Sequence, residues 1–402
     1  MTAPAMRPLL ASAWTVTSPL GRGRAATLDA FRNGRGGLTP CNYPHAHLDT
    51  WIGRVAGLED YRLPQDLAAW DCRNHRLAHL ALAQDGFRDA CTQARERYGA
   101  ANVGVFLGTS TSGIEHTERA YREHEESGAL ARWFDYSHSQ DLFALPAFVR
   151  QSLGLSGPAL TVSTACSSSA KVFATATRYL TAGLCRAAIV GGVDSLCLMT
   201  LYGFHALQLV SAHPCRPADV ARDGINLGEA AGFALLEWPE DAPDAHAAPC
   251  LLGYGESGDA HHMSAPHPEG AGAALAMRAA LQRAALAPSD IDWIHLHGTG
   301  TPANDLAEDR AVHAVFGPGQ VSSSTKGWCG HTLGAAGALG FGFAALALEH
   351  GLIPASLNTQ HVDPALTADI VLENRSSPLR RVMVNAFGFG GNNACLIVGR
   401  EA

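Results

Sequence analysis

The sequence predicts an α/β fold. Short apolar segments suited to strands alternate along the chain with longer segments in which apolar residues recur at helical spacing. The 402 residues are 47% hydrophobic and 16% charged, so the chain can bury a large core, and its length is typical of two to three domain-sized units. The 42 glycines, together with abundant alanine, favour tight packing of helices against a sheet rather than disorder.

The predicted elements follow one another in a regular order. Apolar runs rich in Val, Ile, Leu and Ala predict strands at 103–107, 159–163, 187–193, 231–237, 291–296, 382–386 and 394–398. Helical patterns occupy 170–180, 271–285, 305–316 and 335–349. Gly183 follows the first helical pattern and Gly317-Pro318-Gly319 follows the third, as expected where helices end.

The stretch from Trp238 to Pro249 is the best internal boundary. It follows the strand-like segment 231–237 and is rich in proline and acidic residues, which is typical of a surface connector. It divides the chain into an N-terminal part, 1–238, and a C-terminal part, 239–402. Both parts alternate strands and helices, so a duplicated fold is allowed, although no residue-level repeat is visible.

Composition excludes several classes of protein. The formal net charge of −8 gives no footprint for nucleic acid. The ten cysteines contain no Cys-x-x-Cys pair, and His261-His262 has no matching ligand spacing, so neither a zinc site nor a redox motif is expected. No run is expected to span a membrane and no long apolar core follows the first basic residue, so we expect a cytoplasmic protein with free thiols.

The lysines are the rarest charged residues. The chain has two lysines against 27 arginines, and Lys326 lies in Ser324-Thr325-Lys326-Gly327-Trp328-Cys329-Gly330-His331. A compact ammonium at this place, in a chain that otherwise uses arginine, indicates a chemical need that a planar guanidinium would not meet. Lys171, five residues after Cys166, is interpreted as a lysine placed by chance.

Cys166 is the candidate nucleophile. It follows the predicted strand 159–163 and precedes a helix, among small residues that would leave the thiol accessible. The N–H groups at the start of that helix favour a thiolate, so we expect a pKa below the usual value near ~8.5. The alternative is a small buried cysteine, as most cysteines are.

Two histidines and a glycine-rich segment accompany it. His297 opens His297-Gly298-Thr299-Gly300-Thr301-Pro302 after a predicted strand, and His331 lies at the junction of a loop and a helix. Glycine beside each histidine allows backbone or ligand to approach closely. The segment 385–393, Asn-Ala-Phe-Gly-Phe-Gly-Gly-Asn-Asn, offers free N–H groups and rings that could cover a pocket, without the Gly-Lys-Ser/Thr step of a phosphate-binding loop.

Together these segments resemble the elongating β-ketoacyl-[acyl-carrier-protein] synthases, the Cys-His-His condensing enzymes of type I and II in the thiolase superfamily. The resemblance covers nearly the whole chain. It implies a thiolase-like fold with two similar halves stacked as α-β-α-β-α layers, usually dimeric, with the nucleophile in the first half and both histidines in the second. The matching segments are 18–21, 164–168, 222–237, 297–301, 326–337 and 385–393.

The resemblance implies decarboxylative Claisen condensation of an acyl chain on Cys166 with malonyl-acyl carrier protein, giving a 3-oxoacyl-acyl carrier protein in fatty acid or specialised polyene or polyketide synthesis. His297 and His331, as neutral side chains, would hold the malonyl thioester carbonyl. The N–H groups of Cys166 and Phe389 would form the oxyanion hole. The phosphopantetheine arrives on the carrier protein, and no metal or other cofactor is implied.

Further residues carry family roles by their positions. Lys326 would support the electrostatics of the histidines, with Glu308 as its acidic partner. The remaining candidates would contact the pantetheine arm or the acyl chain, or dock the carrier protein. Thr299 and Thr301 would bind the arm, Phe204 and Phe389 would gate the pocket, Thr111 would tune chain access, and Arg73 and Arg76 are candidates for carrier docking.

Relatives with other activities fit less well. A thiolase would need a second cysteine in the segment 387–390, and a starter-unit synthase would have asparagine where His331 stands. A chain-length factor lacks the nucleophile, so Cys166 argues against that role for this chain. The chain could still be the active subunit of a heterodimer with such a factor, or it could form a homodimer. The motifs at 71–75 and 202–205 favour a specialised pathway.

Overall fold

The computed structural model describes residues 5–124, 128–242, 245 and 248–400. Its main feature is a mixed β-sheet whose strands follow the order β14-β12-β11-β16-β17-β10-β1-β9-β7-β5-β6, with β2 paired to β1. Along this path, the strands from β14 to β10 come from after the predicted boundary, and the strands from β1 to β6 come from before it. The two halves meet where β1 and β10 pair antiparallel, through Leu9 with Leu251 and Leu10 with Cys250.

The two halves repeat one topology. In each, the five strands in chain order are arranged 3-2-4-5-1, with the first three neighbours parallel and the last two steps antiparallel. β14 (Asp369–Ile370) extends the second half at its edge. The first five are β1 (Leu9–Ser18), β5 (Val103–Gly108), β6 (Ala159–Val162), β7 (Ala187–Asp194) and β9 (Ala230–Glu237); the second five are β10 (Cys250–Gly258), β11 (Trp293–His295), β12 (Val321–Ser323), β16 (Arg381–Gly388) and β17 (Asn392–Gly399).

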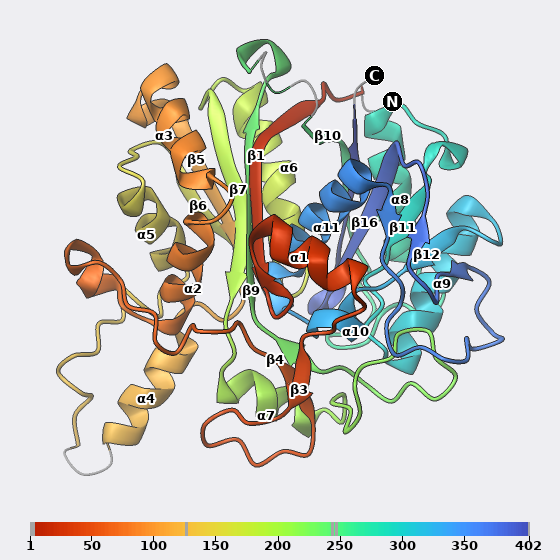
Figure 1. The fold of residues 1–402 in the computed structure, drawn as a ribbon, viewed down its shortest axis with the longest axis horizontal. Coiled ribbons are helices and arrows are strands. Elements are labelled where there is room, and N and C mark those ends of the chain that lie inside the picture. Colours follow the sequence, from red (N-terminus) through yellow and green to blue (C-terminus); the bar gives the residue numbers. More distant parts are fainter. Residues whose placement is uncertain (1–4, 125–127, 243–244, 246–247, 401–402) are drawn as a thin grey trace.

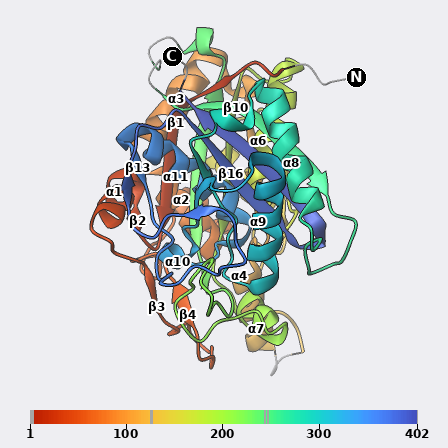
Figure 2. The same ribbon diagram turned by 90° about the vertical axis from the view of Figure 1, so that its right-hand side faces the viewer.

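Helices cover both sheet halves and fill the space between them (Figure 1). The outer layer on the first half contains α2 (Arg73–Leu82), α3 (Phe87–Tyr98) and α5 (Ala144–Ser152). α6 (Ser168–Thr181) and α11 (Ala336–His350) form the middle layer. α8 (Ala271–Ala284) and α9 (Pro302–Phe316) lie next to each other on the outer face of the second half (Figure 2). This arrangement confirms the predicted thiolase-like fold with α-β-α-β-α layers.

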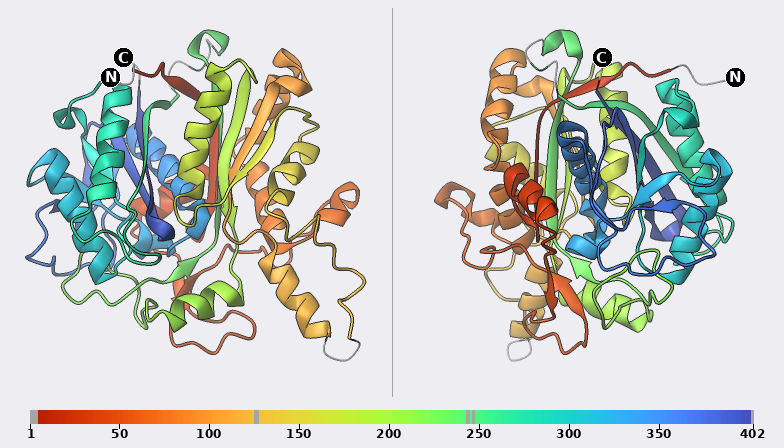
Figure 3. Two further views of the ribbon diagram at one scale, coloured as in Figure 1. Left: turned by 180° about the vertical axis from the view of Figure 1, so that it is seen from behind. Right: turned by 45° about the vertical axis from the view of Figure 1, so that its right-hand side comes forward.

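Successive side chains of a strand point alternately to the two faces of the sheet, so one strand contributes to two hydrophobic clusters. On β17, Ala394, Leu396 and Val398 pack in the central cluster with α6 and α11, whereas Cys395 and Ile397 pack in the outer cluster with α8 and α9. Successive side chains of a strand point to opposite faces, so a strand covered on both faces is apolar throughout. Figure 3 gives two further views of these layers.

The middle layer is tightly packed because small residues lie where its helices cross. A Cβ added at Gly337 of α11 would come within 2.4 Å of the backbone nitrogen of Ala170 on α6. Next to this crossing, the rings of Phe173 and Phe341 stack with centroids 4.8 Å apart. The contact brings together the two helices that follow Cys166 and His331 in the chain.

The expectation that no run is apolar enough to span a membrane is wrong for one segment. Leu333–His350 is long and apolar enough by length and composition. However, 83% of it is buried inside the protein, where it forms the central helix α11 and the turn before it. Its apolar character is therefore accounted for by packing on both sides.

The predicted elements agree closely with the structure. β11 is shorter than predicted, because only Trp293 to His295 pair with neighbouring strands. The predicted boundary falls between β9 and β10; residues 243–244 and 246–247 of this connector lie outside the described residues. The remaining elements are β2 (Gly21–Arg22), α1 (Gly23–Arg32), β3 (Leu38–Pro40), β4 (Trp51–Gly53), η1 (Gln65–Trp70), η2 (Ala100–Asn102), α4 (Ile114–His124), α7 (Leu198–Ala206), β8 (Leu227–Gly228), η3 (Pro239–Asp241), η5 (Pro288–Asp290), α10 (Lys326–Cys329), η6 (Leu333–Ala335), β13 (Leu352–Ile353), β15 (Arg375–Ser376) and η7 (Phe389–Gly391).

Candidate active site

Cys166 lies in a tight turn between β6 and α6, as the sequence predicts. Ala165 before it has a φ of +52°, a left-handed conformation that a residue with a small side chain tolerates best. The turn is held by Ser168, whose Oγ accepts the N–H of Thr164 at 2.9 Å, and by Ser167, whose Oγ donates to the carbonyl of Thr164 at 2.9 Å. The local run of small hydroxyl residues therefore fixes the direction of the cysteine.

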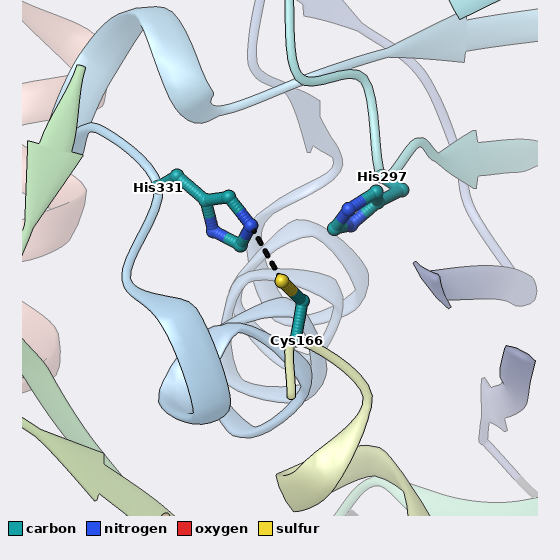
Figure 4. Close-up of side chains that lie close together, drawn as sticks. All are labelled: Cys166, His297 and His331. Atoms are coloured by element: carbon teal, nitrogen blue, oxygen red, sulfur yellow. Dashed lines mark hydrogen bonds between the residues drawn. The ribbon is translucent and has the colours of Figure 1, made fainter. Parts of the chain in front are cut away.

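His331 points its ring at the sulfur (Figure 4). Its Nε2 lies 3.0 Å from Sγ of Cys166, while its Nδ1 accepts the N–H of Leu333 at 3.2 Å. Because Nδ1 is an acceptor, the proton of the neutral ring is on Nε2 and faces the sulfur. The backbone of His331 is held in turn by the carbonyl of Asn226 at 2.7 Å and the N–H of Gly228 at 3.0 Å.

His297 flanks the sulfur on the other side. It follows β11, and its ring centroid is 5.2 Å from that of His331. Nζ of Lys326 lies 3.4 Å from Nδ1 of His297 and also donates to the carbonyl oxygen of the same residue. The ammonium at Nδ1 directs the ring proton to Nε2, as in His331. The sulfur and one ring nitrogen of each histidine all lie within 4.8 Å of one another.

Burial sets the charge states in this cluster. It lowers the pKa of His297 and His331 well below the usual value of 6.5, and the charge of Lys326 lowers both further. Both rings are therefore neutral near pH 7 and can donate hydrogen bonds. Sulfur, imidazole and imidazole are ligand types that zinc accepts, but the buried ammonium of Lys326 opposes the entry of a cation.

The expectation of a lowered pKa for Cys166 is wrong. Burial raises the pKa of this thiol to about 11, although Lys326 and the N–H groups of Phe389 and Cys166 lower it. The groups that lower this pKa are not the N–H groups at the start of α6 that the sequence suggested, and the free energy lost by removing the thiolate from water is larger than their combined effect.

This pKa predicts how Cys166 reacts with iodoacetamide. Because the thiolate is the reactive form, the alkylation rate should rise by about tenfold per pH unit from about pH 7 to about pH 10. Cys41, which is partly exposed, serves as the reference site in the same peptide map. A rate at Cys166 that is already level at about pH 8 would contradict the raised pKa.

Glu308 interacts with Lys326 through its charge rather than through a direct ion pair. The carboxylate raises the pKa of the Lys326 ammonium, but among the described residues no ion pair within 4 Å joins the two. Instead, the carboxylate accepts the N–H groups of His297 at 2.8 Å and Gly298 at 2.7 Å, and the side-chain amide of Asn385 at 2.9 Å. Burial raises the pKa of Glu308 to about 7. The residue thus positions the backbone that carries His297.

A cavity of about 410 Å³ opens from Cys166. Both threonines predicted to bind the pantetheine arm line it, and their hydroxyls are 2.8 Å apart. Phe204 and Phe389 line it as well, with ring centroids 5.5 Å apart. Thr111 does not line this cavity, because its hydroxyl and N–H donate to the buried carboxylate of Asp194.

The turn 388–391 packs directly on the nucleophile turn, and glycine makes this possible. A Cβ at Gly388 would lie 2.7 Å from the carbonyl oxygen of Thr164 and 3.2 Å from the nitrogen of Cys166. The backbone N–H of Phe389, one residue later, lowers the pKa of the Cys166 thiol. The glycine-rich segment therefore supplies an N–H donor beside the nucleophile.

Gly388→Ala is expected to slow acylation of Cys166 by about tenfold to a hundredfold, because the backbone must shift and carry the Phe389 N–H away from the sulfur. The rate is measured by intact-protein mass spectrometry. Gly203→Ala is the matched control, since nothing lies within 4 Å of a Cβ at that position. Equal rates for both variants would contradict this account of the glycine.

Arg73 is wrong as a candidate for docking a carrier protein. It is 8% exposed, and its guanidinium binds the carboxylates of Glu229 and Glu59. Arg76 is half-buried and paired with Asp71, so its charge is largely neutralised. Neither residue lines the cavity at Cys166.

Asp194 is the main residue that sequence reasoning missed. It ends β7, is fully buried, and accepts hydrogen bonds from the 109–111 segment and from the N–H of Gly334, three residues after His331. An aspartate at the end of a strand is common, so the sequence does not single it out. Its role becomes visible only in the structure, through its contact with Gly334, which is 140 residues away in the chain. His295, two residues before His297, is also buried here, with Nε2 at 2.8 Å from the hydroxyl of Thr325.

Comparison with known proteins identifies the family of this chain. The model of the β-ketoacyl synthase N-terminal domain matches residues 72–242, and that of the C-terminal domain matches 249–360. Nodulation protein E of Rhizobium meliloti is 37% identical over 327 residues, 79% of each chain. The 3-oxoacyl-[acyl-carrier-protein] synthase 2 of Vibrio cholerae is 30% identical over 404 residues, 95% of this chain and 96% of the relative.

Among solved structures, a ketosynthase from Xenorhabdus doucetiae, in complex with its chain length factor, is 35% identical and superimposes with a TM-score of 0.87 over 98% of each chain. The matches span both halves of the fold, including the segments that carry Cys166, His297 and His331. The chain described here is therefore an acyltransferase that belongs to the β-ketoacyl synthase family.

Proposed function

We propose that this chain catalyses the decarboxylative condensation of an acyl chain, held on Cys166, with a malonyl thioester of acyl carrier protein. The products are a 3-oxoacyl carrier protein and carbon dioxide. The observation that carries the proposal is the sulfur of Cys166 between two neutral histidines, with Nε2 of His331 3.0 Å from the sulfur.

The first step transfers the acyl group. The sulfur of Cys166 attacks the thioester carbonyl, the bond to the pantetheine sulfur breaks, and the proton lost by Cys166 is regained by the departing thiol. The N–H groups of Cys166 and Phe389 stabilise the negative oxygen of the tetrahedral intermediate. His331 acts as a donor rather than a base here, because its Nδ1 is occupied by the N–H of Leu333.

The second step uses the histidines. The carbonyl oxygen of the malonyl thioester accepts the Nε2–H groups of His297 and His331. When the C–C bond to the carboxylate breaks, carbon dioxide leaves and negative charge develops on that oxygen, where both donors stabilise it. The resulting carbanion attacks the acyl carbonyl and Cys166 leaves as a thiolate, so the chain grows by two carbons.

The other candidates act around these groups. Lys326 and Glu308 position His297 through its ring and its backbone. Thr299 and Thr301 hydrogen-bond the pantetheine arm in the cavity that they line, and Phe204 with Phe389 separates the arm from the acyl chain. Thr111 affects chain access indirectly, through Asp194. No further cofactor is needed, since the pantetheine arrives with its carrier protein.

A related subunit completes the enzyme in this proposal. The similar ketosynthase from Xenorhabdus doucetiae was solved with its chain length factor, at 35% identity to this chain. This supports a heterodimer in which the present chain is the active subunit, in specialised polyene or polyketide synthesis. The alternative is a homodimer in fatty acid synthesis, which is supported by the similarity to 3-oxoacyl-[acyl-carrier-protein] synthase 2.

Mass spectrometry with acyl and then malonyl carrier proteins tests the function, for the parent chain and Cys166→Ala. We expect an acyl adduct on Cys166 in the parent only, followed by a carrier-bound product two carbons longer. An adduct on another residue, or chain extension by Cys166→Ala, would refute the assignment. The acyl chains that are accepted distinguish the two pathways.

A further inference from the structure

Lys171 connects the helix of the nucleophile to the turn that supplies the Phe389 donor. Its Nζ, on α6 and five residues after Cys166, donates to Oδ1 of Asn392 at 3.0 Å. Asn392 is the first residue of β17 and directly follows the turn 389–391. Among the residues that the structure describes, this is the one side-chain hydrogen bond that joins α6 to the segment 388–393.

The turn needs such a restraint because its backbone is unusually free. Gly390 and Gly391 have φ values of +77° and +70°, which glycine adopts readily, and glycine also adopts many other conformations at little cost. The side-chain nitrogen Nδ2 of Asn392 lies 3.2 Å from the point where a Cβ added to Gly390 would stand. The side chain that Lys171 holds therefore lies next to the turn itself.

The other bonds of this turn lead away from the nucleophile. Gly390 donates its N–H to the carbonyl of Met263 at 2.7 Å, and the carbonyl of Gly391 accepts the N–H of Asp259 at 2.9 Å. Asn393 donates its side-chain amide to Asp259 at 2.7 Å. These contacts attach the turn to the 259–263 segment, and Lys171 is the restraint on the side of Cys166.

Partial burial of Lys171 strengthens its hydrogen bond to Asn392. The residue is partly buried, and burial lowers the pKa of its ammonium, while the nearby carboxylate of Glu256 raises it. A hydrogen bond from an ammonium to an amide oxygen is stronger than one between neutral groups, particularly out of bulk water. The bond therefore adds a charged hydrogen bond between α6 and the start of β17, beside the apolar packing of the two elements.

We propose that Lys171 is a positioning residue that holds the 389–391 turn, through Asn392, so that the N–H of Phe389 stays on the sulfur side of Cys166. The inference rests on the proposed function. It assigns Lys171 to the steps that form a tetrahedral oxyanion, which are acyl transfer and condensation. It assigns no part in decarboxylation, whose oxygen is held by His297 and His331.

The test compares Lys171→Met with the parent and with Arg178→Met. The second variant also removes a cation from α6, but Arg178 is more than half exposed and pairs with Glu256. Acylation of Cys166 is timed by mass spectrometry. Loss of carbon dioxide from malonyl carrier protein is measured in a Cys166→Ala background, with and without Lys171→Met. We expect acylation to slow by about tenfold at unchanged KM, decarboxylation to stay within about twofold, and Arg178→Met to match the parent.

A double-mutant cycle with Asn392→Ala identifies the bond. If the two residues act together, Lys171→Met should slow acylation by less than about twofold once Asn392 is alanine. Fully additive effects, unchanged acylation in Lys171→Met, or an equal fall in both reactions with a lower midpoint of unfolding would each overturn the proposal. If the parent chain itself takes no acyl group, the proposed function fails instead, so the two failures are distinguishable.

Discussion

Lys326→Met is expected to lower the condensation rate by about a hundredfold or more. The side chain is 6% exposed, and in the described part of the chain no other ammonium or guanidinium forms a hydrogen bond with Nδ1 of His297. Without it, the ring of His297 can carry its proton on Nδ1, and the Nε2 donor that faces the malonyl oxygen is lost. Removing one donor of this kind typically reduces the rate by about 10²–10³.

The variant should also change the dependence of the rate on pH. The charge of Lys326 lowers the pKa of His297 and of His331, so its removal raises both. A group with a raised pKa is protonated at higher pH, and a protonated ring lacks the neutral form in the mechanism. The acid limb of the rate profile should therefore move to higher pH in Lys326→Met.

Lys326→Arg separates charge from shape. A guanidinium keeps the charge but is planar and larger, and the site is fully enclosed. We expect Lys326→Arg to keep the acid limb of the parent while remaining slow, because the longer side chain displaces His297. Condensation by Lys326→Met at more than half the parent rate, or an unmoved acid limb, would show that the ammonium does not act through the histidines.

The nucleophile and both histidines could be predicted because each lies in a short local motif. Cys166 follows a strand in a run of small residues, and His297 and His331 are flanked by glycine, so the neighbours in sequence are also the neighbours that shape the turn. The fold could be predicted for the same reason, since the strand and helix patterns are local.

The properties that depend on distant segments could not be predicted. The pKa of Cys166 depends on burial by both halves of the protein, and sequence shows the helix N-terminus but not the loss of water around the sulfur. Glu308 lies in the segment expected for the partner of Lys326, yet backbone amides 10 and 11 residues away use its carboxylate. The position of Lys171 could be attributed to chance in the sequence, because its hydrogen-bond partner Asn392 is 221 residues away.

Asp194→Asn is expected to lower the free energy of unfolding by roughly 2–4 kcal/mol. The carboxylate accepts the hydroxyl of Thr109 at 2.7 Å, the N–H groups of Ser110 and Thr111 at 2.9 Å, and the N–H of Gly334. An amide has one acceptor oxygen and adds two donors, so at least two buried donors lose their partner at about 1–2 kcal/mol each. Urea unfolding at one fixed protein concentration measures the change.

The condensation rate distinguishes the role of Asp194 from that of another buried carboxylate, Asp309. Asp309 is also buried and accepts N–H groups of Thr367 and Ala368 at about 3.0 Å, but it lies on α9 away from the cavity at Cys166. Asp309→Asn should therefore lose stability while keeping the parent rate at temperatures where it is folded. Asp194 joins the 109–111 segment to the turn of His331, so in Asp194→Asn the Nε2 donor should move from the sulfur and condensation should slow by about tenfold or more under the same conditions. If both variants lose stability and keep the parent rate, Asp194 stabilises the fold without orienting His331.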